Sequence, residues 1–565
     1  MGTIKNFPQE SEENNVEYKR IIDNDEKEKL DRLGNQILRR INSDSEDGYC
    51  SGEAIYYIGI NDNGSIHACT EEEYNRSVEI LDTVLKRINC VKRELSHKIY
   101  NSNELGFDEI SNGHVGEFLI RESSCKMPIE VTVLIGGSVD AGKSSTLGFL
   151  ISGEKDDGRG KSRLKVLNNK EEIKSGRTMS LSHHILGLDS LGEPIYNPNY
   201  TWSDIVERSK KLIKFVDLAG HEKYAKTTYK GYILIKTGIS FIVVGANMGI
   251  NNITREHIFL CINLKIPFCF VITKIDLCEN RKNVMEETIK SIKDIMNLPS
   301  VRRTIYSVDT DDDILTCARN IHSRSVVPIF KISNVTSYGT DKLIKFLNLV
   351  PQKKIEVKEQ HGNTVEFYID STFKRKGFPC IISGQLLIGT VKVGQEFYVG
   401  PDALKGFKKV VIKSIHYNRT NIDLTFNHSY YCFALKGINR NDVKRSMVMV
   451  DKSQISFYEF EAKITVHCAN KKSSEKTMYN RTCTIRVGYQ PIVHILNVRE
   501  STKILSINDK ISRRTEGDPD VLTNGDSARV RFRFLYHPHY IRVGEEVLFT
   551  EGSIRSIGQV TQVFT

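Results

Sequence analysis

One eight-residue pattern constrains the fold of this chain more than any other feature. Residues 137–144 read Gly-Ser-Val-Asp-Ala-Gly-Lys-Ser and match the phosphate-loop pattern G-x4-G-K-[ST]. An apolar run at residues 131–135 comes directly before it, and Leu147 and Leu150 begin a helical pattern behind it. A strand, a glycine-rich loop and a helix in this order favour a parallel α/β sheet that binds the phosphates of a nucleotide.

The residue types of this loop suit the binding of phosphates. Glycines let the backbone bend so that its N–H groups point at phosphate oxygens, and the N-terminus of the following helix adds positive potential. Lys143 is expected to neutralise the β- and γ-phosphate oxygens, and the Ser144 hydroxyl is expected to hold Mg²⁺. The residues expected to bind the nucleotide here are Gly137, Ser138, Val139, Asp140, Ala141, Gly142, Lys143, Ser144 and Ser145.

A second motif, Asp-Leu-Ala-Gly-His, follows the apolar run at residues 212–216. At the end of a strand the Asp217 carboxylate can reach Mg²⁺, and the Gly220 N–H can reach a γ-phosphate. A hydrolase also needs a group that orients the attacking water, and His221 stands next to the glycine that meets the γ-phosphate. We therefore predict that His221 positions this water. The alternative is an ordinary loop histidine.

A third motif, Thr-Lys-Ile-Asp, follows the apolar run at residues 267–272 and matches the guanine-reading pattern N/T-K-x-D. Asp276 can accept hydrogen bonds from the N1–H and the 2-amino group of guanine, a pair of donors that adenine lacks. Because an unpaired buried carboxylate is costly, the motif favours GTP over ATP. The Lys274 stem can lie along the base, and Thr273 opens the motif.

Two further segments complete the candidate site on weaker signals. Ser333, Asn334 and Val335 are expected to close the base pocket through backbone N–H groups, so that the side chain at 334 matters little. Thr178, in Ser-Gly-Arg-Thr at 175–178, can complete the Mg²⁺ shell when a γ-phosphate is present, or it can be a solvent-exposed loop residue. The candidate catalytic residues are His221, Lys143 and Thr178, and the candidate metal ligands are Ser144, Thr178 and Asp217.

The chain of 565 residues is long enough for several domains. Apolar residues recur at helical spacing from Leu30 to Ile41 and again from Tyr74 to Leu95, and a strand pattern lies between them at 54–60. Short apolar runs alternate with helical patterns after residue 129, and short strands punctuated by glycine follow residue 351.

These patterns predict an α/β phosphate-loop domain, a mostly parallel sheet with helices on both faces, followed by two β-barrels and preceded by a small α+β domain. The predicted division is a disordered tail at 1–20, the α+β domain at 21–128, the phosphate-loop GTPase domain at 129–350, β-barrel domain II at 351–455 and β-barrel domain III at 456–565.

Composition narrows the class of protein. Hydrophobic residues make up 39% and charged residues 27% of the chain, which is typical of globular proteins. No apolar run approaches the ~20 residues of a membrane-spanning helix, so no membrane role is expected. The 12 cysteines include no Cys-x-x-Cys pair, which favours reduced thiols in a cytoplasmic protein.

Charge is unevenly distributed along the chain. Acidic residues outnumber basic ones by nine in residues 1–128, whereas basic residues are in excess by seven in 129–350 and by 12 in 351–565. A basic C-terminal part can attract RNA, or it can be a solvated surface that aids solubility. Alternation from Arg529 to Phe534 places three arginines on one face of a strand, which suits either RNA phosphates or solvent.

Together these motifs resemble the translational GTPases of the elongation factor Tu and elongation factor 1-alpha superfamily, and most of all the GTP-binding-protein-1 group. The resemblance implies a monomeric GTPase that uses GTP/GDP and Mg²⁺, with two β-barrels that embrace an aminoacyl-tRNA and with hydrolysis triggered by the ribosome. The segments that carry the resemblance are residues 136–145, 175–178, 217–224, 273–276 and 333–336, with 54–60, 413–419 and 434–438 outside the GTPase domain.

Two positions depart from the elongation-factor pattern. Arg177 stands where those factors have isoleucine, so Val139 alone would remain of the apolar gate that restrains the histidine. Thr273 stands where asparagine is usual, which is expected to weaken the bracing of the phosphate loop and to leave base selection by Asp276 intact.

Three hypotheses follow. The first is a ribosome-dependent GTPase that binds tRNA or RNA on the ribosome. The second is a GTP-switched RNA-binding adaptor in ribosome rescue or mRNA turnover, in which hydrolysis is incidental. The third, a GTPase subunit that drives a metabolic enzyme such as a sulfurylase, has no special support from the acidic N-terminal part or the basic barrels. Stimulation of hydrolysis by ribosomes distinguishes the first from the second.

Overall fold

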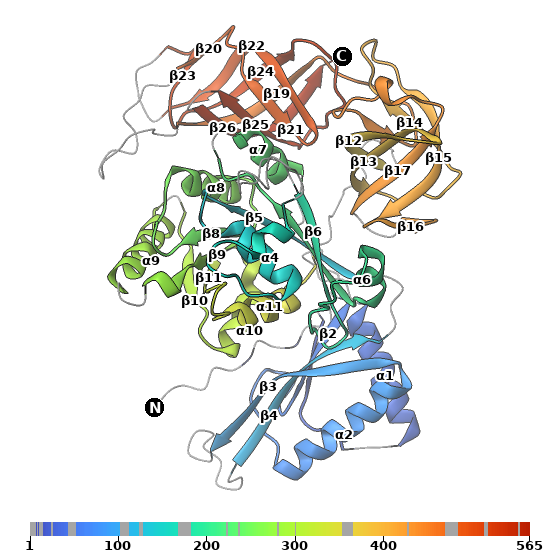
Figure 1. Ribbon diagram of the computed structural model, residues 1–565, viewed down its shortest axis with the longest axis vertical. Coiled ribbons are helices and arrows are strands. Elements are labelled where there is room, and N and C mark those ends of the chain that lie inside the picture. Colours follow the sequence, from blue (N-terminus) through green and yellow to red (C-terminus); the bar gives the residue numbers. More distant parts are fainter. Residues whose placement is uncertain are drawn as a thin grey trace. The chain divides into compact units, whose positions relative to one another are not determined.

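The computed structural model (Figure 1) comprises two compact units, which are described separately below. Unit 1 holds residues 1–220, 237–257 and 266–354, and unit 2 holds 221–236, 258–265 and 355–565. Within the described residues, no helix is long and apolar enough to span a membrane. The structure describes residues 7, 10, 15–23, 26–42, 52–101, 112–123, 128–167, 182–221, 224–234, 238–278, 282–299, 301–352, 365–425, 429–468, 484–512, 518–551 and 554–564.

The N-terminal part of unit 1 is a four-stranded sheet, in the order β1-β2-β4-β3, with two helices. Leu30 and Ile37 of the first helix and Leu81 and Val84 of the second are buried with the apolar residues of β2 and β4. This confirms the predicted α+β character. The bounds are β1 Val16–Lys19, α1 Lys27–Ile41, β2 Glu53–Ile58, α2 Glu71–Arg87, β3 Cys90–Asn101 and β4 Asn112–Glu122.

Two predictions for this part were wrong. Residues 16–19, predicted to lie in a disordered tail, form β1, which pairs in parallel with β2. The apolar spacing that predicts a helix as far as Leu95 crosses a boundary, because α2 ends at Arg87 and β3 begins at Cys90. Asn89 between them has a φ of 55°, a left-handed conformation that stops a helix and that asparagine tolerates.

The second part of unit 1 is a seven-stranded sheet in the order β10-β11-β9-β8-β5-β7-β6. All neighbours are parallel except β6, which is antiparallel to β7. The helices in Figure 1 surround this sheet, which confirms the predicted α/β class. The strands are β5 Ile129–Gly137, β6 Ser182–Leu188, β7 Lys211–Asp217, β8 Ile239–Gly245, β9 Phe268–Thr273, β10 Thr304–Ser307 and β11 Val326–Lys331. The helices are α4 Lys143–Ser152, α6 Trp202–Arg208, α8 Asn252–Asn263, α9 Lys282–Met296, α10 Asp311–Asn320 and α11 Thr340–Leu349.

Unit 2 holds the two predicted β-barrels together with the helix α7, Ala225–Leu234, and the second half of α8, both of which lie in the range predicted for the GTPase domain. The first barrel closes through pairing of β14 with β15, and the second is a closed ring, β19-β24-β22-β21-β25-β26. The first comprises β12 Glu366–Arg375, β13 Phe378–Ile388, β14 Glu396–Gly400, β15 Lys408–Tyr417, β16 Thr420–Ile422, β17 Tyr430–Lys436 and β18 Val448–Val450. The second comprises β19 Glu459–Cys468, β21 Ile492–Ile495, β22 Val498–Ile511, β24 Ser527–Phe534, β25 Glu546–Glu551 and β26 Ile554–Phe564, with β20 Ile485–Arg486 paired to β23 Val521–Leu522.

A buried polar network joins the two barrels. The fully buried Glu366 of β12 accepts a hydrogen bond from the Tyr540 hydroxyl at 2.7 Å and forms an ion pair with Arg542 at 2.9 Å. Asn497 of the second barrel donates its side-chain N–H groups to backbone carbonyls of the first, among them Met447 O at 2.8 Å. The barrels therefore form one body, whereas the residue boundaries of the predicted five-part division remain a prediction.

Candidate nucleotide-binding site

The sheet of unit 1 brings the three motifs to one edge. The phosphate loop follows β5, the Asp217 motif follows β7, and the Thr273 motif follows β9, all at the carboxyl ends of parallel strands. In the register, Ile135 lies opposite Asp217 and Gly245 opposite Thr273. Ligands of open α/β sheets bind at this edge, so the arrangement matches the expected nucleotide site.

The phosphate loop has the tight backbone that its glycines allow. Gly137 has a φ of 134° and Gly142 a φ of 91°, both in the region that disfavours residues with a Cβ. A Cβ at Gly137 would lie 2.3 Å from the carbonyl oxygen of Val243 on β8. The loop therefore packs directly against the sheet, and its N–H groups lie at the N-terminus of α4.

Lys143, the first residue of α4, is only 6% exposed, and its Nζ donates a hydrogen bond to Ser138 O at 2.7 Å. Burial lowers the pKa of Lys143, while the carboxylates of Asp217 and Asp140 oppose that change. The ammonium group is thus held within the curve of the phosphate loop. This position agrees with its predicted role toward phosphate oxygens.

Ser144 and Asp217 form a pair of oxygen donors beside the loop. The Ser144 hydroxyl donates to Asp217 Oδ2 at 3.2 Å, and Asp217 is 1% exposed. Hydroxyl and carboxylate oxygens are ligands that Mg²⁺ accepts, so these two residues fit the predicted metal site. The third predicted ligand, Thr178, lies with Ser175, Gly176 and Arg177 outside the described residues.

Gly220 closes the opposite side of the loop. A Cβ on this residue would lie 2.3 Å from Lys143 Nζ and 2.7 Å from Gly137 O. No side chain fits there unless the lysine or the loop moves. The sequence motif predicts that the Gly220 N–H reaches a γ-phosphate. The structure adds a steric reason for a glycine at this position.

We therefore expect Gly220→Ala to lower the affinity for a non-hydrolysable GTP analogue by about tenfold or more, since Lys143 must leave its place. The affinity for GDP, which lacks the γ-phosphate, should fall less. Fluorescent-nucleotide titration measures both, and thermal unfolding checks that the variant is folded. Equal losses for the two nucleotides would contradict this role of Gly220.

His221, the predicted water-positioning residue, is exposed and begins the segment that leads to α7. Its carbonyl accepts the Tyr224 N–H at 2.9 Å, and the two rings lie 6.1 Å apart. The helix that follows is tied to both barrels. Lys230 pairs with Asp370 of the first barrel, and the Tyr229 ring lies 5.9 Å from His494 of the second.

The guanine motif is bonded to the phosphate loop. The Thr273 hydroxyl donates to Ala141 O at 2.6 Å, and Lys274 Nζ donates to Asp140 O at 2.6 Å. The hydroxyl at 273 thus keeps a direct hydrogen bond to the loop despite the departure from asparagine. Base-reading and phosphate-reading segments are held together by these two bonds.

Side chains of the Ser333 segment do more than the sequence indicates. The Ser333 hydroxyl donates to Asp276 Oδ1 at 2.6 Å and accepts the Thr336 N–H at 3.2 Å. The expectation that the side chain at 334 matters little was wrong, because Asn334 Nδ2 donates to Thr146 Oγ1 of α4 at 3.0 Å. Val335 is 38% exposed beside them. The sequence does not indicate the Ser333–Asp276 bond or the Asn334–Thr146 bond, since the partners are 57 and 188 residues apart.

The arginine face of β24 is occupied by ion pairs within the barrel. Arg529 lies 3.7 Å from Glu461, and Arg533 lies 3.4 Å from Glu459. Arg531 pairs with Glu459 at 2.7 Å and lies 3.9 Å from the centre of a ring, that of Phe564. The three arginine side chains nevertheless keep 47%, 39% and 57% of their surface exposed, so the face contacts solvent, and its binding of RNA stays a prediction.

Several known proteins are similar to this chain in sequence or in fold. A family profile described as "Elongation factor Tu GTP binding domain" matches residues 130–377. GTP-binding protein 1 of Xenopus laevis is 34% identical over 535 residues, covering 93% of this chain and 76% of that protein. GTP-binding protein 2 of Homo sapiens is 33% identical over 566 residues, covering 99% and 88%.

A solved structure agrees with the fold. Translation elongation factor SelB from Methanococcus maripaludis, in complex with the GTP analogue GppNHp, aligns with a TM-score of 0.53 and 17% identity over 78% of this chain and 80% of that one. At this identity the match supports the fold alone. On the sequence relatives, the chain belongs to the GTP-binding protein 1 and 2 family, and its residues 130–377 match the GTP-binding domain of elongation factor Tu.

Proposed function

We propose that this chain hydrolyses GTP to GDP and phosphate, and that the bound nucleotide controls its binding of tRNA or another RNA on the ribosome. The observation that carries the proposal is the set of bonds among the three motifs. Asp217 accepts a hydrogen bond from the Ser144 hydroxyl. Thr273 and Lys274 donate hydrogen bonds to the phosphate loop, and Ser333 donates one to Asp276. These groups have the chemistry to read a guanine base and its phosphates together.

In this mechanism the residues have separate tasks. Lys143 and the loop N–H groups stabilise the charge that develops on the transferred phosphoryl group, and Asp276 selects guanine. His221 orients water for in-line attack, and Thr178 and Asp217 respond to the γ-phosphate. Ser144 and Asp217, together with Thr178, would hold Mg²⁺, which would supply positive charge beside the phosphates.

The covalent path from Gly220 supports a nucleotide switch. Gly220 lies against Lys143, His221 follows it, and α7 then carries Lys230 and Tyr229 into contact with the two barrels. A change at Gly220 on loss of the γ-phosphate is therefore passed along a short stretch of chain to the body that would hold RNA. The GTP form would bind RNA and the GDP form would release it.

The proposed partners are the ribosome and an aminoacyl-tRNA or other RNA, and the proposed compartment is the cytoplasm, with the chain acting as a monomer. The excess of 12 basic residues in 351–565 supports an RNA partner. The sequence match of residues 130–377 to the GTP-binding domain of elongation factor Tu supports the same kind of role.

The test is the rate of GTP hydrolysis with and without purified ribosomes. We expect ribosomes to raise the rate by about 10³-fold or more, and His221→Ala to remove this rise while nucleotide affinity stays unchanged, because the histidine acts only on the attacking water. His67→Ala, a change on the N-terminal domain, is the control and should respond like the wild-type chain.

A different result would redirect the proposal. If saturating ribosomes leave the rate of GTP hydrolysis by the wild-type chain unchanged, the hypothesis of a ribosome-dependent GTPase is rejected in favour of a GTP-switched RNA-binding adaptor. If His221→Ala keeps the full rise, another residue orients the water.

A further inference from the structure

The strands β6 and β7 form a ribbon with two distinct ends. All seven residues of β6 pair with β7, from Ser182 opposite Asp217 at one end to Leu188 opposite Lys211 at the other. The first end carries a predicted ligand of the nucleotide site. The second lies about 20 Å away, at ~3.4 Å per residue. β7 is also paired along its whole length with β5, so Lys211 and Asp217 are the two ends of one continuous strand inside the sheet.

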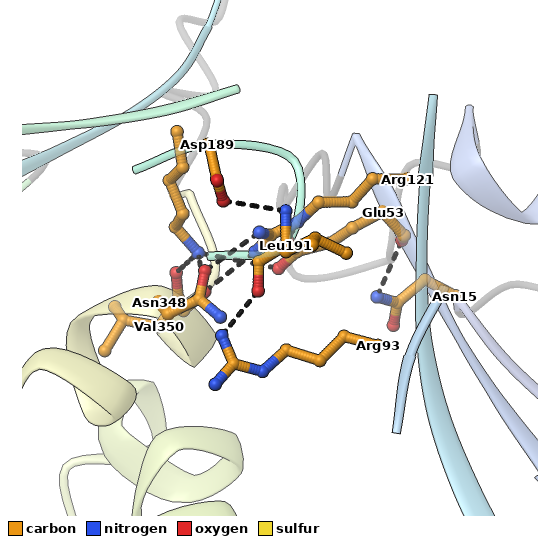
Figure 2. Close-up of polar contacts among 9 residues, drawn as sticks. Asn15, Glu53, Arg93, Arg121, Asp189, Leu191, Asn348 and Val350 are labelled. Carbon is orange, nitrogen blue, oxygen red and sulfur yellow. Dashed lines mark hydrogen bonds and ion pairs between the residues drawn. The ribbon is translucent and has the colours of Figure 1, made fainter. Parts of the chain in front are cut away.

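A buried network at the far end of this ribbon joins the N-terminal domain to the end of α11 in the GTPase domain. Lys211 Nζ donates to Asn348 O at 2.6 Å and to Val350 O at 2.7 Å, and lies 3.6 Å from Glu53 of β2. Figure 2 shows Arg121 of β4 between Glu53 and Asn348, with bonds of 2.7 to 2.9 Å. The side chains of Lys211, Arg121 and Glu53 are 0%, 1% and 5% exposed.

The turn that leaves β6 is also held. Arg93 of β3 donates to the carbonyl of Leu191, as Figure 2 shows, and pairs with Glu193 at 3.1 Å. Asp189 fixes the turn by accepting the N–H groups of Leu191 and Glu193, each at 2.9 Å. The N-terminal domain thus contacts both the start of β7 and the turn after β6.

A second contact between the same two domains does not involve the ribbon. On α10, Arg319 bonds to Glu117 of β4 and to the Tyr57 hydroxyl, and Asp312 pairs with Lys98 of β3 at 2.7 Å. Substitutions can therefore weaken the docking of the N-terminal domain at the ribbon contact while the α10 contact stays intact, or the reverse.

We infer that the N-terminal domain restrains the β6–β7 ribbon, and that its docking is coupled through the ribbon to the nucleotide held at the phosphate loop. A shift of Asp217 between the GDP and GTP forms is passed along β7 to Lys211, and the buried network opposes that shift in one of the two forms. The coupling is reciprocal, so weakening the ribbon contact changes the relative affinity for the two nucleotides. The inference rests on the proposed nucleotide switch.

The experiment measures the ratio of affinities for GDP and a non-hydrolysable GTP analogue in the full chain. Arg93→Ala is compared with Lys98→Ala, since both remove a cation of β3 that pairs with the GTPase domain. We expect Arg93→Ala to change the ratio by about threefold and Lys98→Ala to leave it unchanged within error. A stronger pair is Lys211→Met, expected to change the ratio by about fivefold or more, and Arg319→Met, expected to leave it unchanged.

Thermal unfolding shows whether each pair weakens docking to a similar extent. The inference is overturned if Lys211→Met leaves the affinity ratio at its wild-type value. It is also overturned if Lys211→Met and Arg319→Met change that ratio by the same amount. If the wild-type chain binds neither nucleotide, the proposed function itself fails, whereas normal binding with an unchanged ratio rejects the coupling alone.

Discussion

Replacing Asp276 with asparagine is expected to weaken GDP and GTP binding by about a thousandfold and to create affinity for xanthine nucleotides. The Asp276 carboxylate accepts a hydrogen bond from the Ser333 hydroxyl at Oδ1, and this bond fixes the orientation of the carboxylate toward the base. An amide in this place turns a donor toward the N1–H and 2-amino donors of guanine. Loss of two charge-assisted bonds, each worth about 1.5–3 kcal/mol, accounts for the expected factor.

Xanthine provides the matched ligand, because its carbonyl at position 2 accepts the new N–H donor. Titration with fluorescent GDP and XDP therefore measures the loss and the gain in the same variant. Asp294→Asn, at an exposed position of α9, is the control and should bind GDP normally. Asp276→Asn with unchanged GDP affinity, or with no gain for XDP, would show that this carboxylate does not read the base.

The candidate site could be predicted largely because each motif is local. The strand before the phosphate loop, the loop itself and the helix behind it are contiguous in the sequence, and the carboxyl ends of parallel strands meet at one edge. Bonds between motifs could not be predicted in this way. Nothing in the sequence pairs the Thr273 hydroxyl with Ala141, because that bond depends on how the loop after β5 approaches the end of β9, with β8 between the two strands.

The N-terminal domain shows where periodicity misleads. Apolar residues continue at helical spacing through Val91 and Leu95, yet the left-handed Asn89 ends the helix and the same residues belong to a strand. The strand at Val16 was missed because its partner, Ile55, lies 39 residues away and its surroundings are polar and acidic. In the first case the backbone at one residue ends the helical pattern, and in the second a long-range pairing overrides the local sequence.

The barrel strand β24 was predicted in part. Its alternation correctly places Val530, Phe532 and Phe534 inside the barrel. The partners of its arginines lie on the two neighbouring strands, Glu459 and Glu461 on β19 and Asp509 on β22. Charge on one strand therefore does not identify a ligand surface until the neighbouring strands are known.

Replacing Glu53 with glutamine is expected to cost about 3–5 kcal/mol of the free energy of unfolding of unit 1. The Glu53 carboxylate separates two buried cations, bonding to Arg121 at 2.7 and 2.9 Å and lying 3.6 Å from Lys211. Burial, aided by the positive charge of Arg121, lowers the pKa of Lys211 to about 8 even with Glu53 present. Without the carboxylate the pKa of Lys211 falls further, so the lysine either faces Arg121 as a second buried cation or gives up its proton, and both outcomes cost free energy.

Urea unfolding followed by tryptophan fluorescence measures this cost, because the single tryptophan, Trp202, lies in α6 of the same unit. Asp312→Asn removes an acid from the exposed ion pair with Lys98 and should cost less than about 1 kcal/mol. Adding Lys211→Met to Glu53→Gln should restore part of the loss, since one of the two opposed cations is then gone. If the double variant is no more stable than Glu53→Gln alone, repulsion between buried cations is not the cause, and the lost hydrogen bonds of Arg121 account for the whole effect.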